Sequence, residues 1–118
     1  MTYVDGFVIP VPKGKIAAYK KMAALGKKVW MKHGALQYFE CMGEDLDGMP
    51  GCGNFKKMAR LKPSETAFFS FIVYKSKAHR NAVNKKVMAE MHALPMPDSM
   101  PFDMKRMAYG GFKTLIQG

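Results

Sequence analysis

Two carboxylates on predicted strands are the side chains of this sequence best placed to do chemistry. Asp5 lies in the alternating stretch 3–9, and Glu40 lies in the alternating stretch 35–42. A carboxylic acid that faces a dry layer is desolvated, which raises its pKa and lets it act as a general acid or base. The two residues are therefore the first candidates for a ligand site.

Three further side chains complete this candidate site. Tyr38 and Tyr109 carry phenol hydroxyls, and Arg106 carries a fixed cation in a polar loop before the last predicted strand. Glycines at 110 and 111 indicate a bulge or a close approach by a ligand, because glycine weakens a strand interior. Such groups suit an oxygen-bearing, largely apolar small molecule. The predicted ligand-binding residues are Asp5, Tyr38, Glu40, Arg106 and Tyr109.

The two carboxylates also have a purely structural interpretation. Asp5 and Glu40 can pair with Arg106, Lys113 or backbone amides, as buried polar groups must when they are not functional. The sequence shows no serine–histidine set and no phosphate-binding glycine loop, so catalytic residues stay unknown. Whether the chain is an enzyme is left open by its sequence.

Methionines are unusually frequent, with 12 in 118 residues. Many of them gather with one histidine near the C-terminus: Met88, Met91, His92, Met96, Met100, Met104 and Met107. Thioether sulfurs select Cu(I), which makes a copper site one interpretation. Their spacing is irregular and prolines intervene, which favours core filling by a flexible apolar side chain. We therefore predict no metal and no cofactor.

The chain is strongly basic, with a formal net charge of +10 from 16 lysines and 3 arginines. A basic surface attracts nucleic acid without sequence preference, but arginine is the residue that recognises phosphate and guanine in a bidentate manner. At most weak, non-specific nucleic-acid binding is expected. The dense apolar run 67–74 is too short to span a bilayer, and residues 1–5 do not resemble a signal peptide. We expect a cytoplasmic protein that does not contact membranes.

Hydrophobic periodicity predicts one α+β domain over residues 1–118, with the order β-α-β-β-α-β. This order is typical of a ferredoxin-like fold, in which both helices cover one face of a four-stranded antiparallel sheet. The predicted strands are 3–9, 35–42, 66–74 and 107–116, the helices are 16–33 and 77–91, and a short helical turn lies at 55–60.

The two faces of the predicted sheet differ in composition. Small and aliphatic residues suit packing against helices, so we place Val4, Gly6, Val8, Ala108 and Gly110 under them, facing Ala78, Ala82, Val83, Val87 and Met91 of the second helix. The opposite face then carries Tyr3, Asp5, Phe7, Tyr38, Glu40 and Tyr109. Because so much apolar surface is rarely left open, we expect a homodimer with the two sheets packed face to face and the ligand site between them.

Several segments resemble the YbaA-like family of uncharacterised bacterial proteins. They are the segments 3–8, 34–36, 40–41 and 80–88 and the motif at 100–112, and the resemblance extends over nearly the whole chain. The resemblance implies a dimeric α/β barrel and carries no established activity. Related dimeric α/β barrels include monooxygenases and isomerases of hydrophobic substrates, which is an analogy of fold alone.

Two alternatives to a small-molecule site follow from the same pattern. The RNA-recognition motif shares this element order, and residues 69–74 partly match its aromatic third strand, although Glu65 to Ala67 stand where its basic start belongs. Base stacking also needs an exposed sheet. The other alternative is a structural or interaction protein without a ligand site.

Overall fold

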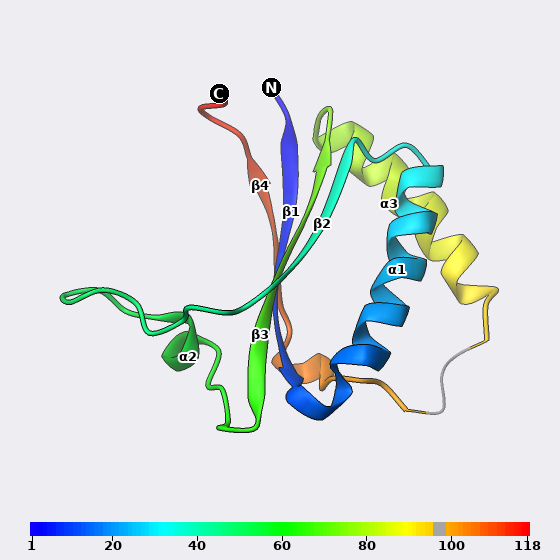
Figure 1. Ribbon diagram of the computed structural model, residues 1–118. Helices are drawn as coiled ribbons and strands as arrows, with labels where there is room; N and C mark the ends of the chain where they lie inside the picture. The colour runs from blue at the N-terminus through cyan, green and yellow to red at the C-terminus, as the bar shows by residue number, and fades with distance from the viewer. Residues whose placement is uncertain (96–98) are drawn as a thin grey trace.

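The computed structural model describes residues 1–95 and 99–118, which form one layer of sheet and one layer of helices (Figure 1). The predicted element order is confirmed. The strands are β1 (Tyr3–Pro12), β2 (Gln37–Met42), β3 (Glu65–Tyr74) and β4 (Ala108–Lys113), the helices are α1 (Ile16–Lys32), α2 (Phe55–Met58) and α3 (Lys77–His92), and short 3-10 helices lie at Lys13–Lys15 and Met104–Arg106.

The four strands form one antiparallel sheet in the order β2-β3-β1-β4. This is the predicted ferredoxin-like arrangement, in which each of the two long helices, α1 and α3, connects two strands that are not neighbours. Helices α1 and α3 cover one face of the sheet, whereas α2 and the loop 43–54 project from the other face (Figure 1). The chain therefore has a helix-covered face and an open face.

Helix α1 packs closely on the sheet because its buried stripe includes two small residues, Ala23 and Gly26. Tyr19, Ala23, Gly26 and Val29 recur at helical spacing, and all four are buried. A Cβ atom added at Gly26 would lie 3.1 Å from the hydroxyl oxygen of Tyr38. Gly26 thus allows the helix backbone to approach β2.

Helix α3 begins at a capped turn, and the face it turns to the sheet differs from the prediction. Ser76 is the N-cap and accepts a hydrogen bond from the backbone N–H of His79. Val83 and Val87 are buried as expected, but Ala78 and Ala82 are exposed. The larger polar residues of the same helix take their place against the sheet, as described below.

Strand β1 is longer than predicted. The prediction ended the strand before Pro10, but both Pro10 and Pro12 lie inside it. Pro10 and Pro12 pair with Ala67 and Glu65 of β3, whereas pairing with β4 ends at Val8. Beyond Val8 the strand has a neighbour on one side only, so a missing N–H need not interrupt a ladder. The last strand is shorter than predicted and ends at Lys113.

The predicted assignment of the sheet faces is wrong. Asp5, Tyr38, Glu40 and Tyr109 lie on the helix-covered face, where their side chains border a pocket together with residues of both helices. The open face instead carries Val4, Gly6, Val8, Ala108 and Gly110, together with Phe39, Phe69, Phe71 and Phe112. The alternation along each strand was predicted correctly, but the two faces were exchanged.

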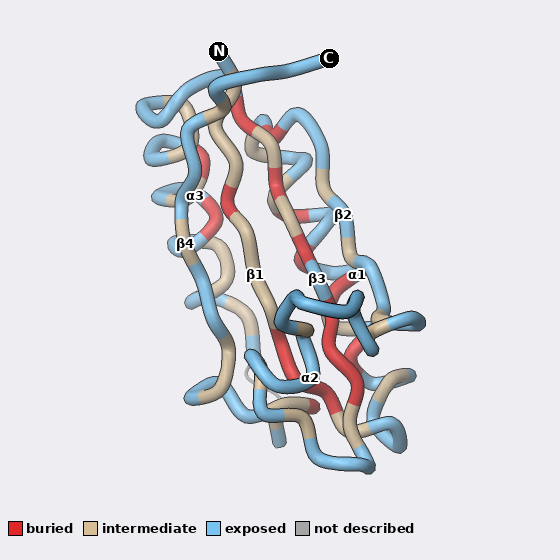
Figure 2. Tube along the Cα trace, turned by 90° about the vertical axis from the view of Figure 1, so that its left-hand side faces the viewer, coloured by how far each residue is buried: buried red, intermediate tan, exposed pale blue. Residues whose placement is uncertain are grey.

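Burial follows this arrangement. The central strands β1 and β3 carry most of the buried strand residues, and the outer strands β2 and β4 are largely exposed (Figure 2). Strand β3 is fully buried on the helix-covered face only, since Phe69 on the open face is 46% exposed. Within the described residues, none of the helices has the length and apolar character needed to cross a membrane.

Candidate functional site

A pocket of about 520 Å³ lies between the sheet and the two long helices. Most of its wall is apolar: Phe7, Ile9, Ile72 and Phe102 contribute rings and branched chains, and Met22, Met88, Met91, Met104 and Met107 contribute flexible thioethers. Its polar groups come from strands, whose geometry is rigid, and from the inner sides of the helices. A concave apolar pocket with a few polar groups is the usual form of a small-molecule site.

Asp5 provides the first polar group of the pocket. It is 1% exposed, and its Oδ2 accepts a hydrogen bond of 3.3 Å from Nδ2 of Asn84. Its Oδ1 lies 3.6 Å from Nη1 of Arg80 and accepts no hydrogen bond from any described residue. A buried carboxylate oxygen without a donor is costly and rare, so this atom is the strongest sign of a missing partner.

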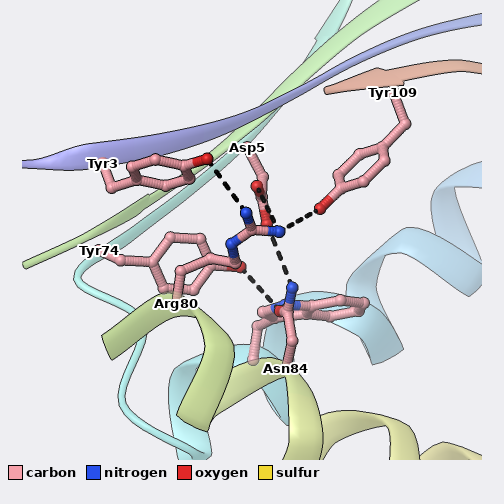
Figure 3. Close-up of polar contacts among 7 residues, drawn as sticks. Tyr3, Asp5, Tyr74, Arg80, Asn84 and Tyr109 are labelled. Carbon is pink, nitrogen blue, oxygen red and sulfur yellow. Dashed lines mark hydrogen bonds and ion pairs between the residues drawn. The ribbon is translucent and has the colours of Figure 1, made fainter. Parts of the chain in front are cut away.

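Arg80 is held in place by two phenols as well as by Asp5 (Figure 3). Its Nη1 donates to the hydroxyl oxygen of Tyr109 at 2.9 Å, and its Nη2 donates to that of Tyr3 at 3.1 Å. The guanidinium also lies 4.9 Å from the centre of the Tyr3 ring. This cation is therefore fixed beside the carboxylate without a direct hydrogen bond to it.

Asn84 orients the other side of the Asp5 carboxylate. Its Oδ1 accepts hydrogen bonds of 3.1 Å from Nε1 of Trp30 and from the hydroxyl of Tyr74. Both are donors, so the amide oxygen faces them and Nδ2 is directed at Asp5. Burial, followed by the charge of Asp5, raises the pKa of Tyr74, which keeps this phenol protonated at neutral pH.

Glu40 provides a second carboxylate with a different environment. Its Oε1 accepts hydrogen bonds from the hydroxyls of Tyr19 (2.7 Å) and Ser70, and its Oε2 accepts one from Tyr38 (2.8 Å). Burial is the main cause that raises the pKa of both Tyr19 and Tyr38, and the neighbouring Glu40 raises it further. Both phenols therefore remain hydrogen-bond donors at neutral pH.

Four of the five predicted site residues lie together at this pocket, and one does not. Asp5, Tyr38, Glu40 and Tyr109 border it. Arg106 instead donates to Oε2 of Glu65 at 2.6 Å and to the backbone carbonyl oxygens of residues 59 and 60. It ties the last loop to the start of β3, and its place beside Asp5 is taken by Arg80.

Sequence reasoning missed the helix residues of the site. Arg80 and Asn84 are spaced by four, so they lie on one side of α3, and Trp30 comes from the neighbouring helix. That spacing was visible in the sequence. Ala78 and Ala82 are small and apolar, so sequence pattern alone favours them at the sheet over the longer polar residues.

Four methionines of the predicted cluster border the pocket, at positions 88, 91, 104 and 107. Met96 lies outside the described residues. Among residues 1–95 and 99–118, no group of three or more His, Cys, Asp or Glu side chains could hold a metal ion. The methionine sulfurs serve this pocket as wall atoms.

Charge is distributed unevenly between the two layers. Segments 13–32 and 77–92, which contain α1 and α3, hold eleven basic residues and one acidic residue. Their net charge of +10 equals that of the whole chain, so the remaining basic and acidic residues cancel. The positive potential therefore belongs to the helical layer, and the open face of the sheet lies on a part of the molecule with no net charge.

Comparison with known proteins places the chain among bacterial relatives. Residues 2–104 match the family model described as protein of unknown function, DUF1428. The chain is 42% identical over 117 residues to the uncharacterized protein YbaA of Escherichia coli K12, with 98% of both chains covered. The same values hold for the protein of that name from Shigella flexneri.

Two solved structures have a loosely similar shape. One is the NE2512 protein of unknown function from Nitrosomonas europaea, with a TM-score of 0.47 and 16% identity over 100% of this chain and 94% of that one. The other is the de novo designed protein Foldit4, with a TM-score of 0.45 and 10% identity over 99% of this chain and 100% of that one. Neither likeness bears on function.

Proposed function

We propose that this chain, which belongs to the DUF1428 family of proteins of unknown function, binds a small, largely apolar, oxygen-bearing molecule between its helices and its sheet. The observation that carries the proposal is Oδ1 of Asp5, a buried carboxylate oxygen without a hydrogen-bond donor on the wall of an apolar pocket. A ligand atom that donates to it would remove a desolvation cost that the protein alone leaves uncompensated.

The apolar wall supports the same proposal. A pocket of about 520 Å³ is within the range of small-molecule sites, roughly 300–1,000 Å³. Methionine side chains adapt their shape at little cost, which suits a wall that must close around a ligand. We therefore propose this pocket within a single chain in place of the ligand site predicted between two sheets.

A ligand screen tests this proposal, because Trp30 is the single tryptophan of the chain and borders the pocket. A library of small alcohols, phenols, ketones and acids should contain compounds that raise the melting temperature and change the Trp30 fluorescence. The same compounds should lose effect on Asp5→Asn. The matched control is Lys86→Gln, an exposed position of α3 that does not border the pocket. The proposal fails if no compound acts on the unmodified chain.

A homodimer is part of the same proposal. Phe39, Phe69 and Phe112 are each more than 40% exposed on the open face. This face belongs to the segments outside the basic helical layer, whose net charge is zero. Two such faces would bury each other's rings without charge repulsion. Light scattering at micromolar concentration should give roughly twice the 13.2 kDa chain mass, and Phe69→Asp should reduce it. A monomer would contradict the assembly but leave the pocket intact.

The cytoplasm is the compartment we propose. Cys41 and Cys52 are both exposed and unpaired. Exposed free thiols persist where the surroundings are reducing.

The basic helical layer favours a second, weaker function. Its charge of +10 should attract nucleic acid through phosphate contacts that release counterions. Binding to duplex DNA should therefore be sequence-independent and should fall steeply between about 50 and 200 mM salt. Sequence-selective binding that survives this range would favour a nucleic-acid module over the pocket.

A further inference from the structure

We infer that the head group of the ligand is a neutral hydroxyl, as in an alcohol or a phenol, which donates to Oδ1 of Asp5 and accepts from the hydroxyl of Tyr109. The inference rests on the proposed function of the pocket. It adds the chemical class of the group that the pocket recognises.

The ligand must supply a hydrogen-bond donor. Oδ2 of Asp5 already accepts from Asn84, whereas Oδ1 accepts nothing from the described residues and lies 3.6 Å from the nearest guanidinium nitrogen of Arg80. A ketone or an ether brings only acceptors and would leave Oδ1 unpaired. Leaving one buried polar group unpaired costs on the order of 1–3 kcal/mol, which a donating ligand avoids.

The ligand must also be uncharged. Arg80 is permanently protonated, and its Nη1 forms an ion pair with the Asp5 carboxylate, so the two side chains already balance each other. The remaining pocket wall around them is apolar. A carboxylate or an ammonium ion brought into this site would add a buried charge without a counterion.

Tyr109 supplies the complementary donor. Its oxygen accepts from Nη1 of Arg80 at 2.9 Å, so its own hydrogen points away from Arg80 and can turn between Asp5 and a ligand oxygen. Burial, and then the charge of Asp5, raises the pKa of Tyr109, so the phenol keeps this hydrogen at neutral pH. Tyr109 and Asp5 border the same pocket, so one ligand hydroxyl can reach both.

The rings beside this pair favour an apolar body attached to the hydroxyl. Phe7 packs against Tyr109 with ring centroids 4.9 Å apart, and Ile72 continues the apolar floor of the pocket. Such a floor shields the Asp5 side of the head group from water, since Asp5 is 1% exposed. A hydrogen bond formed there discriminates strongly between ligands that can make it and ligands that cannot.

Three matched compounds test the inference: 4-tert-butylcyclohexanol, its methyl ether and 4-tert-butylcyclohexanecarboxylate. They share one apolar body and do not absorb where Trp30 does, so the Trp30 fluorescence reports binding of each. We expect the alcohol to bind at least about tenfold more tightly than the ether or the carboxylate, the loss that one unpaired buried group produces.

Two variants test whether Asp5 and Tyr109 are the residues that distinguish the alcohol from the ether. Asp5→Asn and Tyr109→Phe should each weaken binding of the alcohol about tenfold and leave binding of the ether unchanged. Tyr109 is 49% exposed, so its variant should fold even if the Asp5 variant does not. Lys86→Gln should bind all three compounds as the unmodified chain does.

The outcomes separate the inference from the proposed function. Equal binding of the three compounds, or tightest binding of the carboxylate, overturns the inference and leaves the pocket as a binding site. Binding of none of the three also overturns it. The proposed function itself fails only if the wider ligand screen gives no binder either.

Discussion

The two carboxylates of the pocket lie on the helix-covered faces of β1 and β2, which β3 separates, and their surroundings differ. Glu40 accepts hydrogen bonds on both oxygens from three hydroxyl groups and has no ion-pair partner among the described residues. Asp5 has one oxygen bonded to Asn84 and the other unbonded beside Arg80. Both oxygens of Glu40 are therefore satisfied by the protein, whereas Asp5 keeps one oxygen that can still accept a hydrogen bond.

This contrast assigns separate roles to the two ends of the pocket. The Glu40 end joins β2 and β3 to α1 through side-chain hydrogen bonds, which is a structural role. The Asp5 end is held rigid by Asn84 and Arg80 of α3 and still offers an acceptor. Pre-organised groups with unused capacity are what a binding site requires.

The largest effect should come from removing the structural carboxylate. Glu40→Leu leaves the hydroxyls of Tyr19, Tyr38 and Ser70 without their acceptor, so we expect a loss of about 2–4 kcal/mol in the free energy of unfolding. Urea unfolding measures it. Glu40→Gln, which retains one carbonyl oxygen, should lose less. A Glu40→Leu chain as stable as the original would contradict the structural role.

The next effect tests the opposite end. Asp5→Asn retains the shape of the side chain but removes the counterion of Arg80, which keeps its hydrogen bonds to Tyr3 and Tyr109, so we expect a loss of about 1–2 kcal/mol in the free energy of unfolding, less than for Glu40→Leu. Binding of an alcohol should nevertheless weaken about tenfold. Thermal unfolding and fluorescence titration on the same sample give both numbers. A large stability loss with unchanged binding would exchange the roles of the two carboxylates.

A smaller effect compares the tyrosines of the two ends. Tyr38→Phe removes a donor to Glu40 and should cost about 1 kcal/mol of stability. Tyr109→Phe removes one acceptor of Arg80 at a half-exposed position, so its cost should be below about 0.5 kcal/mol. Parallel urea titrations measure both. Equal losses would show that the two ends are equally structural.

The last predicted effect, a loss of stability, is absent at neutral pH and appears only at alkaline pH. The folded-state pKa values of Tyr19 and Tyr38 are raised above the ordinary value of 10, chiefly by burial. The folded state therefore holds these protons more tightly, so their contribution to stability is complete below about pH 10 and is lost as the pH rises further. Unfolding free energies between about pH 8 and 11 should fall at the alkaline end, and less steeply for Tyr38→Phe. A flat profile would contradict the hydrogen bonds to Glu40.

The fold was predictable because it is carried by local patterns. Alternation along the strands, the apolar stripe of α1 and the N-cap at Ser76 each depend on a few neighbouring residues. The lengths of β1 and β4 were less predictable, since they depend on where the pairing between these two strands ends. Pro10 and Pro12 look like the end of a strand until that edge is known.

The site was predictable only in part. Which side chains of a strand share a face follows from local alternation, but which of the two faces packs against the helices depends on the whole fold. Asp5 and Tyr38 were placed on faces with the right neighbours, but the cost of burying a carboxylate under a helix argued for the wrong face. That cost is offset by donors on other elements, above all Arg80, Asn84 and Tyr19. Arg106 was placed at the site because its polar loop directly precedes the strand of Tyr109, whereas its pairing with Glu65 depends on the fold and is not visible in the sequence.

The five methionines of the pocket wall make the site sensitive to oxidants. Conversion of Met22, Met88, Met91, Met104 or Met107 to the sulfoxide would place a strong dipole where the wall is apolar. Met88 and Met104 are 44% and 56% exposed, so peroxide can reach these two first. A molecule that fits the reduced pocket would then meet a polar wall at its edge. Methionine sulfoxide reductases would restore the apolar wall, so the proposed binding would depend on the oxidative state of the surroundings.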